Sequence, residues 1–158
     1  MQKARRVGGH SHDQTLEAIV GDLRRATGAS RTTLRLEDAA GDFPIVAEDR
    51  GDGIPSLRGR SVGDLRAAAT FRHLERERVP LIQDDLLDAD PAPPAALIEQ
   101  YGARAQMLAP LLRDGRLVGI VSVHESAGPR AWTSADVAAL ETATARIAAH
   151  ITERGADE

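Results

Sequence analysis

The chain contains no cysteine, and its 158 residues include only two Phe, one Tyr and one Trp. Without cysteine it can form no disulfide, no thiolate metal site and no cysteine nucleophile. So few aromatic rings and a net charge of −4 provide neither base-stacking platforms nor an extended positive surface. No apolar run approaches 18 residues, and the N-terminus lacks the apolar core of a signal peptide. These absences predict a soluble cytoplasmic protein with no nucleic-acid or membrane partner.

The chain is long enough for one sizeable core, and 42% of its residues are hydrophobic. We expect a flexible lead at residues 1–10, a single domain at 11–154 and a short tail at 155–158. His10 and His12 form an HxH pair that could contact a metal. A solvated lead-in is the simpler interpretation, because no third ligand is fixed nearby.

The most informative stretch runs from Arg104 to His124. Two apolar segments flank Asp114-Gly115, a dipeptide that favours a type I′ hairpin because both residues must accept positive φ. If Arg113 pairs with Arg116, regular alternation fixes the two faces. One face then carries small or polar residues, namely Ala105, Met107, Ala109, Ser122 and His124. The other face carries Leu108, Val121 and Val123. We therefore predict a pocket floor on the first face and core packing on the second.

The remaining elements follow from periodicity and caps. Helices are predicted at 11–27, where Ser11 and Gln14 match a capping box, and at 64–77, around 94–100 and from Thr133 to about 151. Strands are predicted at 31–36, 44–48 and 79–83, and residues 49–63 form a loop. The strand at 31–36 repeats the asymmetry of the hairpin, because Leu34 and Leu36 alternate with Thr33 and Arg35.

Two stretches together resemble the GAF domain family. One is GASRTTLRL at residues 28–36, and the other runs from Tyr101 to Ile151. The second stretch contains MLAPLLRDGRLVGIVSVH and then PRAWTSADVAALETATARIAAHI, which is similar to the family's proline-containing strand, its hairpin and its W-[ST]-x-x-D helix start. The resemblance covers nearly the whole chain from about Ser11.

The resemblance implies an α+β fold of α/β/α sandwich type. A central antiparallel sheet of five or six strands would carry the terminal helices on one face and a ligand pocket on the other, under loops and short helices. GAF domains are mostly sensory or regulatory modules that bind small molecules, and many form dimers through their terminal helices. The resemblance therefore implies a small-molecule sensor, a homodimer and a possible protein partner in trans.

The resemblance carries over unevenly to individual residues. Thr33 and Ser122 match positions that contact ligand in cyclic-nucleotide members, but the NKFnD pattern of those members is not recognisable. Covalent bilin attachment and free methionine sulfoxide reductase activity both need cysteine. The haem-binding type has a histidine just before the central strand, where this chain has 101–104. From these departures we expect no cofactor.

A compact polar or anionic ligand would suit the polar face, because an arginine fork binds planar anions bidentately. Arg35, Arg104 and His124 are the cationic donors, and Asp84 and Asp85 directly follow the strand at 79–83. The candidate ligand-binding residues are Thr33, Arg35, Asp84, Asp85, Tyr101, Arg104, Met107, Ser122 and His124. Alternatively, Arg35 pairs with Asp84 or Asp85 and His124 bonds only the backbone.

Two other functions remain open. An enzyme would use His124 as general base, polarised by an aspartate, with Ser122 or a water as nucleophile. No nucleophile elbow accompanies that pair, so hydrolysis is the weaker interpretation. A dimerisation scaffold with a collapsed pocket would favour large apolar residues where Ala105, Ala109 and Ser122 stand.

Overall fold

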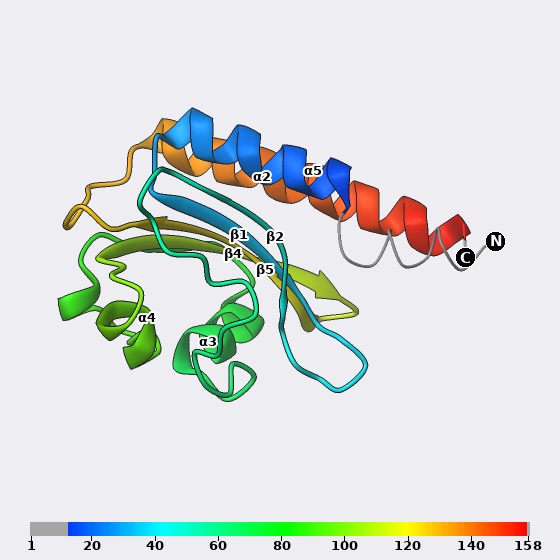
Figure 1. Cartoon of the computed structure of the whole chain (residues 1–158). Helices are drawn as coiled ribbons and strands as arrows, with labels where there is room; N and C mark the ends of the chain where they lie inside the picture. The colour runs from blue at the N-terminus through cyan, green and yellow to red at the C-terminus, as the bar shows by residue number, and fades with distance from the viewer. Residues whose placement is uncertain (1–12, 158) are drawn as a thin grey trace.

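The computed structural model describes residues 13–157, and its centre is a five-stranded antiparallel sheet with the order β2-β1-β5-β4-β3. The strands are β1 (Arg31–Leu36), β2 (Ile45–Arg50), β3 (Leu81–Gln83), β4 (Ala105–Arg113) and β5 (Arg116–Glu125). Helices α2 (Gln14–Thr27) and α5 (Ser134–Asp157) lie side by side on one face (Figure 1). The other face is covered by α3 (Ala69–Glu77), η1 (Leu86–Asp88), α4 (Ala95–Glu99) and long loops. The predicted α+β sandwich is confirmed.

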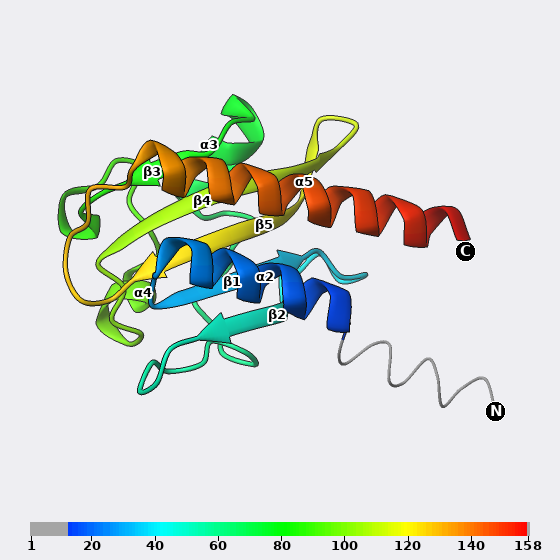
Figure 2. The same cartoon turned by 90° about the horizontal axis from the view of Figure 1, so that it is seen from above.

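Two cores lie on the two faces of the sheet. Helix α2 presents Leu16, Ile19, Val20 and Leu23 to the strands, and α5 presents Leu140 and Ile147. Seen from above, α2 crosses β1 and β2 while α5 crosses β4 and β5 (Figure 2). On the opposite face two smaller clusters form under the covering segments, one around Phe71 and Leu74 and the other around Leu57 and Leu97. The side chains of the sheet are therefore covered on both faces.

The ends of α2 follow local capping chemistry. Asp13 is the N-cap and accepts a hydrogen bond from Leu16 N at 3.1 Å. Gly28 ends the helix with φ of 68°, a conformation that glycine adopts without steric cost. The predicted Ser11 cap lies outside the described residues, as do the lead at 1–10 and the pair His10 and His12.

Helix α5 begins with the predicted capping box. Asp136 N donates to Thr133 Oγ1 at 3.1 Å, and Thr133 N donates to Asp136 Oδ2 at 3.0 Å. The guanidinium of Arg130 lies over the ring of Trp132 and bonds Asp136, while the Trp132 indole donates to Gln83 O at 3.2 Å. This cluster fastens the start of α5 to β3. The helix then continues to Asp157, beyond position 154 where the sequence placed the end of the domain.

The hairpin between β4 and β5 corrects the predicted register. Asp114 and Gly115 have φ of 53° and 78°, and Arg113 pairs with Arg116, both as predicted. A β-bulge between Leu111 and Leu112 then shifts the pairing by one residue. Past the bulge Met107 pairs with Val123 and Leu108 with Ser122, so every side chain of β4 beyond this point changes face. Gly119 fits the tight approach, because a Cβ there would lie 2.8 Å from Arg35 O.

Other element boundaries also differ from prediction. Helix α3 begins at Ala69 rather than 64, and Ala68 is its N-cap. Strand β3 begins at Leu81, and β2 extends to Arg50. No helix among residues 13–157 combines the length and apolar character needed to cross a membrane.

Candidate functional site

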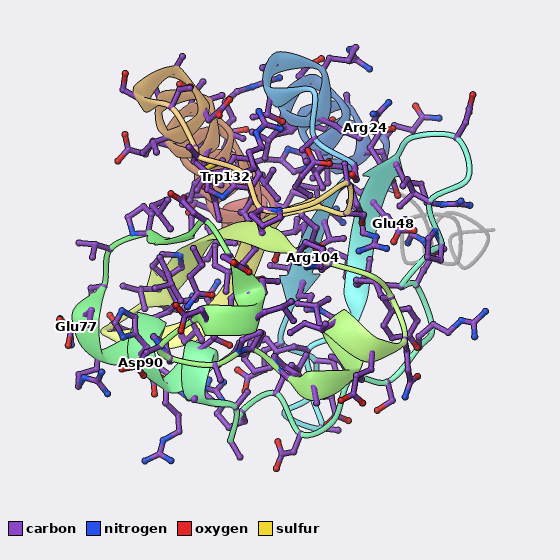
Figure 3. All side chains as sticks on the ribbon, turned by 90° about the vertical axis from the view of Figure 1, so that its left-hand side faces the viewer. Arg24, Glu48, Glu77, Asp90, Arg104 and Trp132 are labelled. Atoms are coloured by element: carbon purple, nitrogen blue, oxygen red, sulfur yellow. The ribbon has the colours of Figure 1, made fainter. Side chains whose placement is uncertain are left out.

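Polar side chains gather on the face of the sheet opposite the terminal helices. They come from three neighbouring strands, and none is more than 8% exposed: Arg31, Thr33, Arg35, Gln106, Ser122 and His124. The register brings Thr33 opposite Ser122 and Arg31 opposite His124. Figure 3 views the molecule from the left-hand side of Figure 1, with the terminal helices above the sheet and the covering segments below it. The polar face therefore lies inside the protein rather than on its surface.

A small cavity separates this polar face from the cover, which is formed by residues 51–80 and 84–104 between the strands. Its volume is about 30 Å³, and Arg35, Gln106, Ser122 and His124 form its polar side. The cover contributes mainly apolar groups, namely Leu57, Val62, Leu65, Thr70, Phe71, Pro94 and Leu97. A space of this size holds about one water molecule. Apolar walls with a few convergent polar groups are typical of small-molecule sites, although such sites usually measure about 300–1,000 Å³.

Arg31 is fully buried and fastens the cover to the sheet. Its Nε and Nη2 donate to Pro55 O at 3.2 and 2.8 Å, and Nη2 lies 3.5 Å from Tyr101 O. Burial lowers the pKa of Arg31, while the charge of Glu48 acts in the opposite direction. That carboxylate is itself bound by Ser56 Oγ and, at 2.8 Å, by Leu57 N. The segment around 55–57 is therefore held from both β1 and β2.

His124 is held as a neutral donor. Burial, followed by the charges of Arg31 and Arg35, lowers its pKa well below the usual value of 6.5. Arg31 Nη1 lies 3.1 Å from His124 Nδ1. A guanidinium can only donate, so Nδ1 accepts and the ring proton resides on Nε2. Among residues 13–157 no side chain or carbonyl accepts a hydrogen bond from this Nε2.

Arg35 and Thr33 carry hydrogen-bonding capacity that the described residues leave unused. Arg35 Nη1 donates to Phe43 O at 2.6 Å, the one hydrogen bond of this guanidinium within residues 13–157. Burial lowers the pKa of Arg35 to about 10, so it remains a cation at neutral pH. Thr33 Oγ1 is fully buried and has no hydrogen-bond partner. Such a buried hydroxyl carries an uncompensated desolvation cost.

Of the predicted site residues, Arg35, Ser122 and His124 line the cavity, and Thr33 lies on the same face of the sheet, paired with Ser122, without lining the cavity. Ser122 and His124 lie on the cavity face as expected, but Met107 does not. It packs in the core beneath α2 and α5, as does Ala109. The predicted floor was wrong for these β4 residues because the bulge reverses their alternation.

The other predicted residues lie around the cavity rather than on it. Tyr101 is buried beside Leu97, and only its carbonyl meets Arg31. Arg104 lies just before β4 (Figure 3) and does not line the cavity. Its buried Nε has no hydrogen-bond partner in the described part of the chain. Asp85 caps η1 by accepting from Leu87 N at 3.1 Å, and Asp84 is exposed. Neither aspartate contacts Arg35, so the alternative of an ion pair there was wrong.

Sequence reasoning missed Arg31 and Gln106. Arg31 shares the alternation of Thr33 and Arg35 and could have been found as the next residue along the same face. Gln106 was missed because the bulge shifts the register and pairs it with His124 on the polar face. Its Nε2 donates to Gln83 Oε1 at 2.9 Å, and Gln83 Nε2 donates to Pro91 O at 2.7 Å. These two amides tie the polar face to the segment that precedes α4.

The enzyme alternative required a carboxylate on His124. The structure places the Arg31 guanidinium on Nδ1 instead, and a cation at this position opposes the protonation that a general base must undergo. The scaffold alternative expected a collapsed pocket, and a cavity of about 30 Å³ is close to that. The scaffold alternative does not explain why the remaining donors of Arg35 and those of Thr33 and His124 lack acceptors among residues 13–157.

The fold is that of a small α+β sandwich domain, with a buried polar face on the side of the sheet away from the terminal helices. The chain belongs to the GAF domain family, whose sequence profile matches residues 11–151. This result confirms the resemblance predicted from the hairpin and the start of the last helix.

The similar proteins are sensory. A Synechocystis protein assigned as a methyl-accepting chemotaxis protein is 25% identical over 123 residues, which are 76% of this chain and 12% of that protein. The GAF domain of Thermosynechococcus elongatus PixJ, in its blue-light absorbing form, gives a TM-score of 0.70 at 21% identity, covering 90% of this chain and 88% of that one. The chromophore-binding domain of the bacteriophytochrome RpBphP3 from R. palustris gives a TM-score of 0.75 at 24% identity, and the match covers 98% of this chain and 60% of that one. A sensory role is therefore shared by these relatives.

These structures correct the expectation about cofactors. We expected none, yet the matching folds include chromophore-binding domains of cyanobacteriochromes and phytochromes. In this chain the cavity of about 30 Å³ is closed by Leu57, Phe71 and Leu97, and no cysteine is present for a covalent bond. The arrangement described here therefore does not fit a tetrapyrrole unless the cover moves.

Proposed function

We propose that this chain is a cytoplasmic sensory domain that binds a compact anionic small molecule on the polar face of its sheet. Arg35 supplies the positive charge, and Ser122 and His124, which line the same cavity, supply hydrogen bonds. The bound molecule then changes how the covering segments sit on the sheet. The sensory class of the similar proteins supports this function.

The observation that carries the proposal is the unused donor capacity of Arg35. A buried guanidinium normally has a carboxylate or several carbonyls as partners, because its desolvation is costly. Arg31, four residues earlier on β1, meets this rule through Pro55, Tyr101 and His124. Within residues 13–157, Phe43 O is the one hydrogen-bond acceptor of Arg35, and Arg35 borders a cavity. An oxyanion in that cavity would provide the missing acceptors.

A thermal-shift screen with acetate, formate and inorganic phosphate tests the proposal. A ligand at about 100 times its Kd stabilises the folded state by about 2.7 kcal/mol. Arg35→Met should abolish the rise in midpoint produced by the best anion. Arg146→Met is the matched control, because Arg146 is an exposed α5 residue paired with Asp22 and the charge change is the same. An equal response of wild type and Arg35→Met would refute the proposal.

A tetrapyrrole held without a covalent bond is the second candidate, favoured by the match to chromophore-binding structures. It requires the cover around Leu57 and Leu97 to move away from the sheet. Protein purified from cells supplied with bilin would then show a visible absorption band that coelutes with the folded chain in gel filtration. A preparation from such cells without that band would remove this candidate.

We further propose that the output passes through a homodimer formed by α2 and α5. The two helices lie side by side on the face away from the cavity (Figure 2). A groove of about 480 Å³ between α5 and β4 is lined by small and apolar residues that include Ala145, Ala148 and Ile151. A second copy of α5 would cover them. Sedimentation should show a dimer for wild type and a monomer for Ala148→Glu, whereas two identical profiles would contradict this assembly.

A further inference from the structure

A second hollow adjoins the cavity and shares three of its walls. It measures about 350 Å³ and lies between the loop at 38–44, which joins β1 to β2, and the loop at 60–66. Arg35, Val62 and Leu65 line both spaces. The Arg35 side chain therefore borders the small inner cavity on one side and this outer basin on the other.

The two spaces differ in chemistry as well as size. The inner cavity offers Arg35, Ser122 and the neutral His124, all of which can donate to an oxyanion. The outer basin is mostly polar and carries both signs of charge, from Arg60 and from Asp42 and Asp64. Asp38, which also lines it, is occupied by hydrogen bonds from Ala40 N and Asp42 N at 3.0 Å each.

We propose that the two spaces form one site for an organic carboxylate with a hydroxyl-bearing body. Its carboxylate enters the inner cavity and meets Arg35, and its body remains in the outer basin. The inner cavity, at about 30 Å³, has room for about one water-sized group and so admits only the oxygen end of the carboxylate, whereas the basin has room for several carbon atoms. A basin lined by polar groups of both signs suits neutral hydroxyls better than an apolar chain or a second anion. This inference rests on the proposed anion site and names the rest of its ligand.

Four probes separate the parts of the site. Gluconate has the carboxylate and a hydroxylated body, sorbitol keeps the body without the carboxylate, hexanoate keeps the carboxylate on an apolar chain, and formate is the head group alone. Titrations followed by NMR of the side-chain nitrogens of the full chain should give a Kd for gluconate at least tenfold below the other three. A gluconate Kd no lower than that of formate would overturn the proposal.

Ser61→Trp tests the basin without touching the inner cavity, because Ser61 is exposed and lines only the outer space. It should raise the gluconate Kd at least tenfold and leave the formate Kd unchanged. Thr142→Trp, at an exposed position on α5 across the sheet, should leave both unchanged. Unaltered gluconate binding in Ser61→Trp would overturn the basin. Absence of formate and gluconate binding to wild type would instead refute the anion site itself, so the two failures are distinguishable.

Discussion

Thr33→Val should stabilise the ligand-free protein, which is unusual for a substitution at a fully buried position. The hydroxyl of Thr33 has no hydrogen-bond partner among residues 13–157, and burying such a group costs about 1–3 kcal/mol in proteins. Valine has nearly the same shape and removes the hydroxyl. We expect the free energy of unfolding to rise by about 1 kcal/mol, equivalent to about 2–4 °C in the midpoint for a domain of this size.

The adjacent Thr32 provides a control of the opposite sign. It is also fully buried, but on the helix-facing side of β1, where its Oγ1 donates to Val20 O at 2.6 Å. Thr32→Val removes a satisfied hydrogen bond and should lower the free energy of unfolding by about 0.5–1.5 kcal/mol. The same chemical change at neighbouring residues should therefore give shifts of opposite sign.

Urea unfolding of wild type and both variants, with and without the best anion of the thermal-shift screen, measures the effect. Thr33→Val should gain stability without the anion and keep the anion-induced increase, because Thr33 does not line the cavity. Thr32→Val should keep that increase in full. Destabilisation of Thr33→Val by 1 kcal/mol or more in the absence of anion would show that the hydroxyl has a partner, and would refute the reasoning.

Further predictions concern pH and backbone packing. His124 is neutral in the folded state and titrates near 6.5 when unfolded, so the unfolded chain binds more protons below pH 6.5 and stability falls as the pH drops. Between pH 6.5 and 5 the free energy of unfolding should change with a slope that approaches ~1.4 kcal/mol per pH unit. Urea unfolding should show this slope in wild type and in the control His73→Gln but not in His124→Gln. A slope that persists in His124→Gln would contradict the assignment to His124. Gly119→Ala should cost about 1–3 kcal/mol, because its Cβ would meet Arg35 O at 2.8 Å, whereas Gly128→Ala, with open space around it, should change urea stability by less than about 0.5 kcal/mol. Equal effects of the two glycine substitutions would argue against the tight β1–β5 contact.

The sequence predicted the fold well because its strongest signals are local. Asp114-Gly115 specifies a turn through backbone sterics, and the Thr133 and Asp136 pair specifies a helix start through two reciprocal hydrogen bonds. The alternation of Leu34 and Leu36 with Thr33 and Arg35 specifies the two faces of β1. Each signal acts within a few residues and needs no knowledge of the rest of the chain.

The site was predicted less well because its geometry depends on pairings between distant residues. One extra residue at the bulge beside Leu111 moves Met107 to the core and Gln106 to the polar face, although the apolar pattern of β4 fits either register. The role of Arg31 depends on Pro55 and Tyr101, which come from a loop and from the end of a short helix. Neither contact has a sequence signature.

The contrast between Arg31 and Arg35 connects binding to the movement of the cover. Both are buried on the same face of β1, four residues apart. Arg31 donates hydrogen bonds to the covering segment and to His124, whereas within residues 13–157 Arg35 donates only to Phe43 O. An anion that reaches Arg35 also approaches His124, whose Nδ1 is bonded to Arg31. Any shift of that ring changes the Arg31 guanidinium, which holds Pro55. The chain of contacts from cavity to cover therefore passes through three side chains on two adjacent strands.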